Sequence, residues 1–92
     1  MRLNKEDYNK AMQCLRRYDY NTANINTCEK EHKAVEQAKL LLDNDSKYIF
    51  EEEFRKKRNK WEIINELHIS EETYKRRRRN LVYTVYEELK KL

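Results

Sequence analysis

The chain contains no glycine and no proline among its 92 residues, and only two cysteines. Residues suited to tight hairpins and sharp turns are therefore scarce, and we expect an all-α fold. The absence of glycine also excludes a glycine-rich phosphate-binding loop. No apolar run is long enough to span a bilayer, and the N-terminus carries no signal-peptide core. We therefore expect a cytoplasmic protein that does not enter a membrane.

Side chains that could bind a metal or carry catalysis are also few. The soft metal ligands are limited to Cys14, Cys28, His32 and His68. Cys28 and His32 stand four residues apart and could share a metal, but no second close pair completes a tetrahedral site. A structural role for these residues is the better interpretation, and cytoplasmic cysteines should be reduced. No Ser-His-Asp or Cys-His pattern stands out, so the sequence predicts no enzyme, no metal and no cofactor.

Charge, by contrast, is abundant and unevenly distributed. Charged residues make up 41% of the chain and hydrophobic residues 38%, which suggests a thin core. The net charge is +4, but residues 55–79 hold ten Lys or Arg against four Glu, a local excess of six. The remainder therefore sums to about minus two. A basic segment joined to a mildly acidic remainder indicates binding of a polyanion by one part of the molecule, with a solvated charged surface as the alternative.

Two short helices joined by a tight turn are indicated from Asn59 onward. Asn59 can cap the first helix, and Glu62 three residues later completes a capping box. Ser70 is a second N-cap, and the helix that follows it should continue to about Lys90. The apolar face of the first helix is predicted to consist of Trp61, Ile64 and Leu67. Helix, short turn, cap and basic second helix is the order of parts in a DNA-binding helix-turn-helix.

The N-terminal part of the chain also has helical periodicity. Asn4 can start a first helix with an apolar stripe at three-to-four spacing. Residues 19–27 have weak helix propensity, so we expect a break near residues 19–22, with Asn21 or Thr22 capping the next helix. A single long kinked helix is the alternative.

A second apolar seam runs from Ile25 to Leu42 at helix–helix spacing. An intramolecular helical hairpin and a homodimer interface both fit this seam. Asp43 to Ser46 reads as a linker and cap, followed by a short helix over residues 47–58. The expected division is an N-terminal helical segment at residues 1–43, for packing, oligomerisation or partner binding, and a helix-turn-helix domain at residues 44–92.

The spacing within the last helix assigns roles to its cations. We expect residues 71–80 to enter the major groove, with Arg76 as the first base reader because its guanidinium matches guanine bidentately. Tracing inward from Leu81 gives Arg77 or Arg78, whose stems should lie on the core edge while their charges reach phosphate. The predicted base readers are Glu72, Thr73, Lys75 and Arg76. The predicted phosphate contacts are Ser70, Lys56, Lys57, Arg58, Lys60, Arg77, Arg78 and Arg79. For each single residue the alternative is an ordinary surface charge.

Residues 47–92 resemble region 4 of sigma-70-type factors, and more closely the small phage late-gene transcription activators of the ArpU/RinA type. The resemblance is carried by Tyr48-Ile49-Phe50, Phe54, Trp61-Glu62-Ile63-Ile64, Leu67-His68-Ile69-Ser70, Thr73-Tyr74, the arginine run and the hydrophobic C-terminal tail. It implies a sigma-like helix-turn-helix that binds promoter DNA in a bacterial host cell and regulates phage late genes, including packaging genes. The family usually carries glycine where this chain has His68, so His68 is expected to adopt a left-handed or strained conformation.

Other functional classes fit the same features. The helix-turn-helix half could instead bind RNA polymerase or another regulator, with the acidic-leaning N-terminal half as part of the contact. A DNA-recognition subunit of a phage packaging machine also pairs a small helix-turn-helix with an oligomerising helix. RNA binding through the arginine-rich helix is a further alternative.

Overall fold

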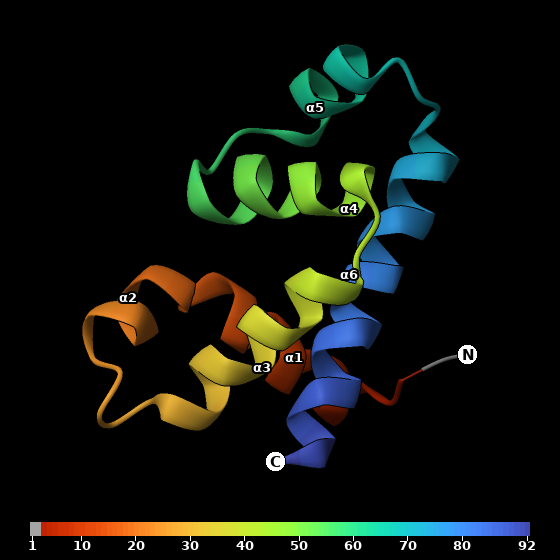
Figure 1. The fold of residues 1–92 in the computed structure, drawn as a ribbon. Coiled ribbons are helices and arrows are strands. Elements are labelled where there is room, and N and C mark those ends of the chain that lie inside the picture. Colours follow the sequence, from red (N-terminus) through yellow and green to blue (C-terminus); the bar gives the residue numbers. More distant parts are fainter. Residues whose placement is uncertain (1–2) are drawn as a thin grey trace.

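The computed structural model describes residues 3–92, and every regular element in that range is helical (Figure 1). This confirms the predicted all-α fold class. No helix within residues 3–92 is both long and apolar enough to cross a membrane. The elements in chain order are α1 (Lys5–Arg16), α2 (Tyr18–Ala23), α3 (Glu29–Leu41), α4 (Asn44–Ile49), the π-helix η1 (Phe50–Arg55), α5 (Lys60–Leu67) and α6 (Glu71–Lys91).

Side-chain caps begin four of these helices, and three of the caps, Asn4, Asn59 and Ser70, are the residues that the sequence predicts. Asn4, Asp43, Asn59 and Ser70 precede α1, α4, α5 and α6. Each side-chain oxygen accepts a hydrogen bond from the backbone N–H three residues later, at 2.7–3.1 Å. These bonds satisfy N–H groups that have no partner within the helix. In a chain without glycine or proline, such caps set the element boundaries.

The helix break expected near residues 19–22 is misplaced, because those residues lie inside α2. The chain bends instead at Arg17 and turns between Ala23 and Glu29. Neither expected cap residue begins a helix: Thr22 donates to the carbonyl of Tyr18 at 2.9 Å, and the Asn21 amide donates to Glu31 of α3 at 3.1 Å. Contacts across the fold therefore satisfy the polar side chains that lower the intrinsic helix propensity.

The segment after α3 also differs from the prediction. Residues 43–46 are not a linker, because α4 already begins at Asn44, directly after its cap Asp43. The helix expected at residues 47–58 ends at Arg55, and its second half is the π-helix η1. Residues 56–59 then connect η1 to α5, with Lys56 in a helical and Lys57 in a left-handed backbone conformation.

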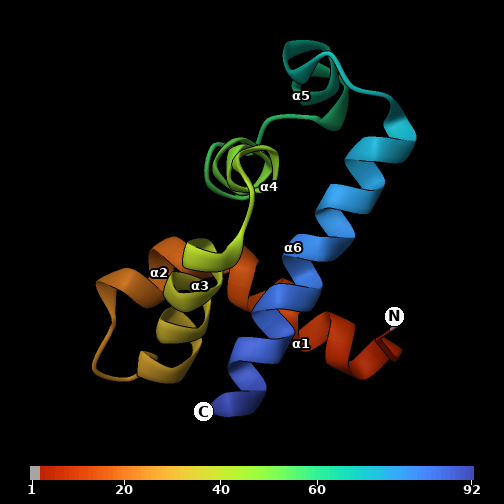
Figure 2. The same ribbon diagram turned by 45° about the vertical axis from the view of Figure 1, so that its right-hand side comes forward.

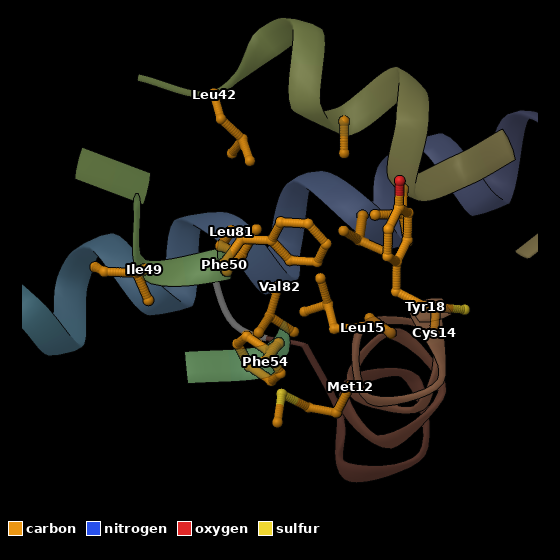
Figure 3. Close-up of a cluster of buried hydrophobic side chains, with 14 of the residues drawn as sticks. Met12, Cys14, Leu15, Tyr18, Leu42, Ile49, Phe50, Phe54, Leu81 and Val82 are labelled. Atoms are coloured by element: carbon orange, nitrogen blue, oxygen red, sulfur yellow. The ribbon is translucent and has the colours of Figure 1, made fainter. Parts of the chain in front are cut away.

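The long helix α6 is the element on which the other helices assemble. Helices α1 and α3 pack along its C-terminal half, whereas α4 and η1 lie beside its N-terminal half (Figures 1 and 2). Leu15, Val35, Phe50, Leu81 and others form one continuous core cluster, with Phe50 only 1% exposed. Figure 3 shows side chains from α1, η1 and α6 meeting there. The segments on either side of the expected boundary at residue 43 thus share a core.

The predicted apolar face of α5 is wrong at Trp61. Ile63 and Ile64 are buried and Leu67 packs against the core, but the Trp61 side chain is 55% exposed. Ile63 lies two residues after Trp61, which places the two side chains on nearly opposite sides of the helix. Because the core takes up Ile63, Trp61 faces solvent.

Candidate nucleic-acid interface

The turn between α5 and α6 has the geometry of a left-handed helix cap. His68 has φ 56° and ψ 43°, which confirms the left-handed conformation expected for this residue. Its N–H donates to Asn65 and the N–H of Ile69 donates to Ile64, both at 3.3 Å. This pairing satisfies carbonyl groups at the end of α5, as in a Schellman motif. Ser70 then caps α6, so the two helices are joined through only three residues.

Arg58 fastens α5 to η1 through a group of carboxylates. Its guanidinium donates to Glu52 at 2.7 Å, to Glu62 at 3.2 Å and to Glu66 at 2.9 Å. The Tyr48 hydroxyl also donates to Glu66. The Arg58 guanidinium, with help from Tyr48, lowers the pKa of Glu66 to about 2. Arg58 thus already neutralises acids of its own chain, where the sequence predicts a phosphate contact.

Arg78, in the N-terminal half of α6, is likewise held by side chains of other elements. It donates to both carboxylate oxygens of Glu53, at 2.8 and 3.0 Å, and to the Tyr8 hydroxyl at 3.1 Å. Its guanidinium carbon lies 5.4 Å from the ring centroid of Phe54. Burial lowers the pKa of Arg78, but the Glu53 carboxylate outweighs burial and the pKa is raised. The stem of Arg78 lies on the core edge as predicted, but its charge is directed to η1 instead of outward.

Arg77 is bound on the other flank of α6. Its guanidinium lies 3.0 Å from the Asp43 carboxylate, the same residue that caps α4. Burial raises the pKa of Asp43, but the Ser46 N–H and Arg77 outweigh it and the pKa is lowered. Arg58, Arg77 and Arg78, which the sequence predicts to contact phosphate, are thus already paired with carboxylates of the same chain. The sequence does not show most of these pairs, because the acids come from η1, from α5 and from the cap that precedes α4.

Arg76 and Arg79 are arranged differently. Both are exposed, and neither side chain has an ion pair, hydrogen bond or ring contact with any residue between 3 and 92. Together with Asn80 and Tyr83 they line a hollow of about 230 Å³. The positions 76, 79, 80 and 83 share one face of a helix, opposite the face that carries the buried Tyr74, Leu81 and Val85. Asn80 and Tyr83 are not among the predicted site residues, although their spacing from Arg76 places them on its face of the helix.

The first turns of α5 and α6 are joined by charge. Lys60 of α5 lies 2.8 Å from Glu71 of α6, and Lys75 lies 3.7 Å from the same carboxylate oxygen. The hydrogen bond from Lys60 is the main cause that lowers the pKa of Glu71. Lys57, which precedes α5, is exposed with φ 60°, a left-handed conformation that no sequence signal indicates. Lys60 therefore links the N-terminal turn of α5 to the acidic N-terminal turn of α6, which carries Glu71 and Glu72.

The predicted site residues differ in their accessibility. Among the predicted base readers, Thr73 is half-buried, whereas the exposed ones are Glu72, Lys75 and Arg76. Among the predicted phosphate contacts, the exposed ones are Ser70, Lys56, Lys57 and Arg79, and the half-buried ones are Arg58, Lys60, Arg77 and Arg78. The exposed members are thus spread over α6, its cap and the connection before α5.

The candidate metal ligands of the chain do not form a site. Residues 3–92 contain no cluster of three or more His, Cys, Asp or Glu side chains placed to hold an ion. His32 stacks on the Tyr18 ring, and its Nδ1 lies 3.1 Å from the Thr22 hydroxyl. Burial raises the pKa of the Cys14 thiol to about 11, so this thiol is protonated at neutral pH.

Comparison of the chain with protein-family models, with curated proteins and with solved structures finds no match.

Proposed function

We propose that the protein is a sequence-specific DNA-binding regulator of transcription, in which α5 and α6 act as a helix-turn-helix. The observation that carries this proposal is the pair of exposed arginines on the outer face of α6, Arg76 and Arg79, neither of which has a partner among residues 3–92. Their neighbours Arg77 and Arg78 are occupied by carboxylates of the same chain. An arginine without a protein partner can pair with phosphate or guanine without first breaking an internal ion pair.

The contacts of each cation support a division of roles within this proposal. Arg76 remains the first candidate base reader, with Glu72, Thr73 and Lys75 beside it on the N-terminal half of α6. Arg79 lies one turn further along and is assigned to phosphate. The other proposed phosphate contacts are Ser70, Lys56, Lys57 and Lys60. The Lys60–Glu71 pair is partly exposed on both sides, so it contributes little and can be exchanged for phosphate. The exposed Lys56 pairs with the buried carboxylate of Glu52, which keeps Arg58 as a partner when Lys56 turns to phosphate. Arg58, Arg77 and Arg78 stabilise the fold through their ion pairs and are no longer proposed as phosphate contacts.

The biological context rests on the resemblance of residues 47–92 to phage late-gene transcription activators. We propose a promoter of a phage late operon as the target and activation as the outcome. A reporter gene behind such a promoter, in cells with and without the protein, tests both. Unchanged or reduced expression would reject activation while leaving DNA binding open.

Selection from a random duplex pool tests DNA binding directly. The selected duplex would then be titrated with wild-type protein and with the Arg76→Ala and Arg79→Ala variants across a salt series. Arg76→Ala should relax the sequence preference, with a loss of about 1–3 kcal/mol on the selected duplex. Arg79→Ala should weaken binding to all sequences and reduce the magnitude of the salt slope by about 0.9.

Arg16→Ala is the matched control, because Arg16 of α1 is also exposed and has no ion pair within residues 3–92. This variant removes the same charge from a different helix. It should bind the selected duplex almost as well as wild type. If no sequence is enriched, or if all three variants behave alike, α6 is not a base-reading helix.

A protein-interaction module is the second candidate function. Leu40 and Leu41 at the end of α3 are 76% and 64% exposed, which favours a protein contact at this place. The occupant would be a second copy of the chain or RNA polymerase. Sedimentation of wild type and Leu41→Ser distinguishes them, because only a homodimer would dissociate in the purified variant. A dimer would also predict a repeated half-site in the selected duplex.

A further inference from the structure

The only tryptophan of the chain, Trp61, lies in the first turn of α5 and is 55% exposed. Its neighbours Ile63 and Ile64 enter the core, so the indole contributes little to the packing of α5. Tryptophan is among the side chains that contribute most binding energy when an interface covers them. Its exposure therefore calls for a partner.

A continuous series of contacts connects Trp61 to α6. The Lys60 Nζ lies 4.9 Å from the centroid of the Trp61 ring and 2.8 Å from Glu71 of α6. The same Glu71 oxygen lies 3.7 Å from the Lys75 Nζ. Lys75 is adjacent in sequence to Arg76, the proposed base reader. The indole is thus at the edge of the same cationic surface.

We propose that Trp61 packs against the sugar–phosphate backbone of duplex DNA at the edge of the major groove entered by α6. This inference rests on the proposed function and extends it to α5. In a helix-turn-helix the first helix crosses the DNA backbone while the second enters the groove. The indole would cover deoxyribose carbons, and Lys60 beside it would neutralise the adjacent phosphate. A backbone contact makes Trp61 a positioning residue that carries no sequence preference.

The charges around the ring favour DNA over a protein partner. Lys60 lies against the ring, Lys75 follows through Glu71, and Lys57 is exposed shortly before α5. A protein surface that covered Trp61 would also cover these ammonium groups, which is costly unless it supplies carboxylates. A phosphate backbone supplies one negative charge at every nucleotide. A phosphate backbone therefore fits the surroundings of Trp61 better than a protein surface does.

Because Trp61 is the sole tryptophan, its fluorescence reports on this one site. A short mixed-sequence duplex with a fluorescent end label would be titrated at low salt, with label anisotropy measuring binding. Acrylamide quenching of Trp61 would be recorded in the free and bound protein. We expect quenching to fall on binding. Trp61→Ala should weaken binding roughly fivefold for every sequence, while Trp61→Phe should retain most of the affinity.

Tyr20→Ala is the matched control. Tyr20 is 54% exposed, and Arg17 lies 4.8 Å from its ring centroid, so its exposure and its cationic neighbour resemble those of Trp61. It lies on α2, far from α5 in both views (Figures 1 and 2). Its loss should leave duplex affinity unchanged. Thermal melts of each variant would confirm that these exposed substitutions leave the fold intact.

The outcomes separate this inference from the proposed function. If the labelled duplex binds but Trp61 quenching and Trp61→Ala affinity are unchanged, the Trp61 contact is rejected and the helix-turn-helix stands. If the wild type binds no duplex at all, the proposed function itself fails. If single-stranded DNA, or added RNA polymerase without DNA, protects Trp61 better than duplex does, the backbone contact is overturned in favour of that partner.

Discussion

Replacing Arg78 by alanine should destabilise the protein without weakening the proposed binding of DNA. Replacing Arg76 by alanine should weaken that binding and leave the stability of the fold almost unchanged. The two arginines lie two residues apart in one run, so charge and composition do not distinguish them. Arg78 has Glu53, Tyr8 and the Phe54 ring around its guanidinium, whereas Arg76 is exposed and unpaired within residues 3–92. The expected difference therefore comes from tertiary contacts alone.

The magnitude follows from the burial of the Arg78–Glu53 pair. Removing one partner of a fully buried pair costs about 3–5 kcal/mol, because the other charge is left without compensation. Here the side chains of Arg78 and Glu53 are 26% and 19% exposed, so water can partly solvate the remaining carboxylate. We expect a loss of about 2–3 kcal/mol for Arg78→Ala, which lowers the melting temperature by roughly 10–20 °C in a domain of this size.

Arg76→Ala should change the free energy of unfolding by less than about 0.5 kcal/mol, as is usual for an exposed residue. Urea denaturation gives the stabilities, and duplex titration below both melting temperatures gives the affinities. The double variant Glu53→Gln/Arg78→Met is the control, since it removes both charges and should recover part of the stability. Equal destabilisation by Arg76→Ala and Arg78→Ala would refute the distinction between a structural and a free arginine.

Three further predictions concern the residues that support the proposed helix-turn-helix. The pKa of Glu66 is lowered from the ordinary 4.5 to about 2, so its contact with Arg58 stabilises the fold above pH 4.5 and is lost as pH falls toward 2. The difference in unfolding free energy between wild type and Glu66→Gln, measured with urea, should therefore narrow between these pH values. A constant difference would contradict the role given to Glu66. His68→Gly should raise the free energy of unfolding by about 0.5–1 kcal/mol, because glycine adopts positive φ without a Cβ clash, whereas His68→Ala should not. Phe50→Ala should cost about 3–5 kcal/mol, because Phe50 is buried edge-on against Tyr18 at 5.2 Å; a loss below about 1 kcal/mol in the same assay would place Phe50 outside the core.

Local signals predicted the helical class and the starts of α1, α5 and α6. The absence of glycine and proline indicated an all-α chain, and Asn4, Asn59 and Ser70 cap helices as predicted, whereas the cap expected within residues 43–46 is Asp43 and its helix begins earlier than expected. These caps act within three residues of their own position, so they depend little on the rest of the fold. The left-handed conformation of His68 was expected from the resemblance, whereas that of Lys57 had no local signal.

Features that depend on distant contacts were predicted less well. The weak propensity of residues 19–22 suggested a break, but Asn21 finds Glu31 on α3 and the helix persists. The spacing of Trp61 predicted a core residue, but the face of α5 that packs on the core is the one that carries Ile63 and Ile64. In both cases the deciding partner lies on another element, which periodicity along one helix does not reveal.

The sequence by itself determined that this protein is helical, where its helices are capped, and that its cations concentrate around residues 55–79. These properties follow from each residue's own backbone preferences and charge, so they can be read along the chain. Only the tertiary structure decided which cations are free. Glu53 and Asp43 reach Arg78 and Arg77 because α4 and η1 pack beside α6, and that same packing leaves Arg76 and Arg79 facing solvent.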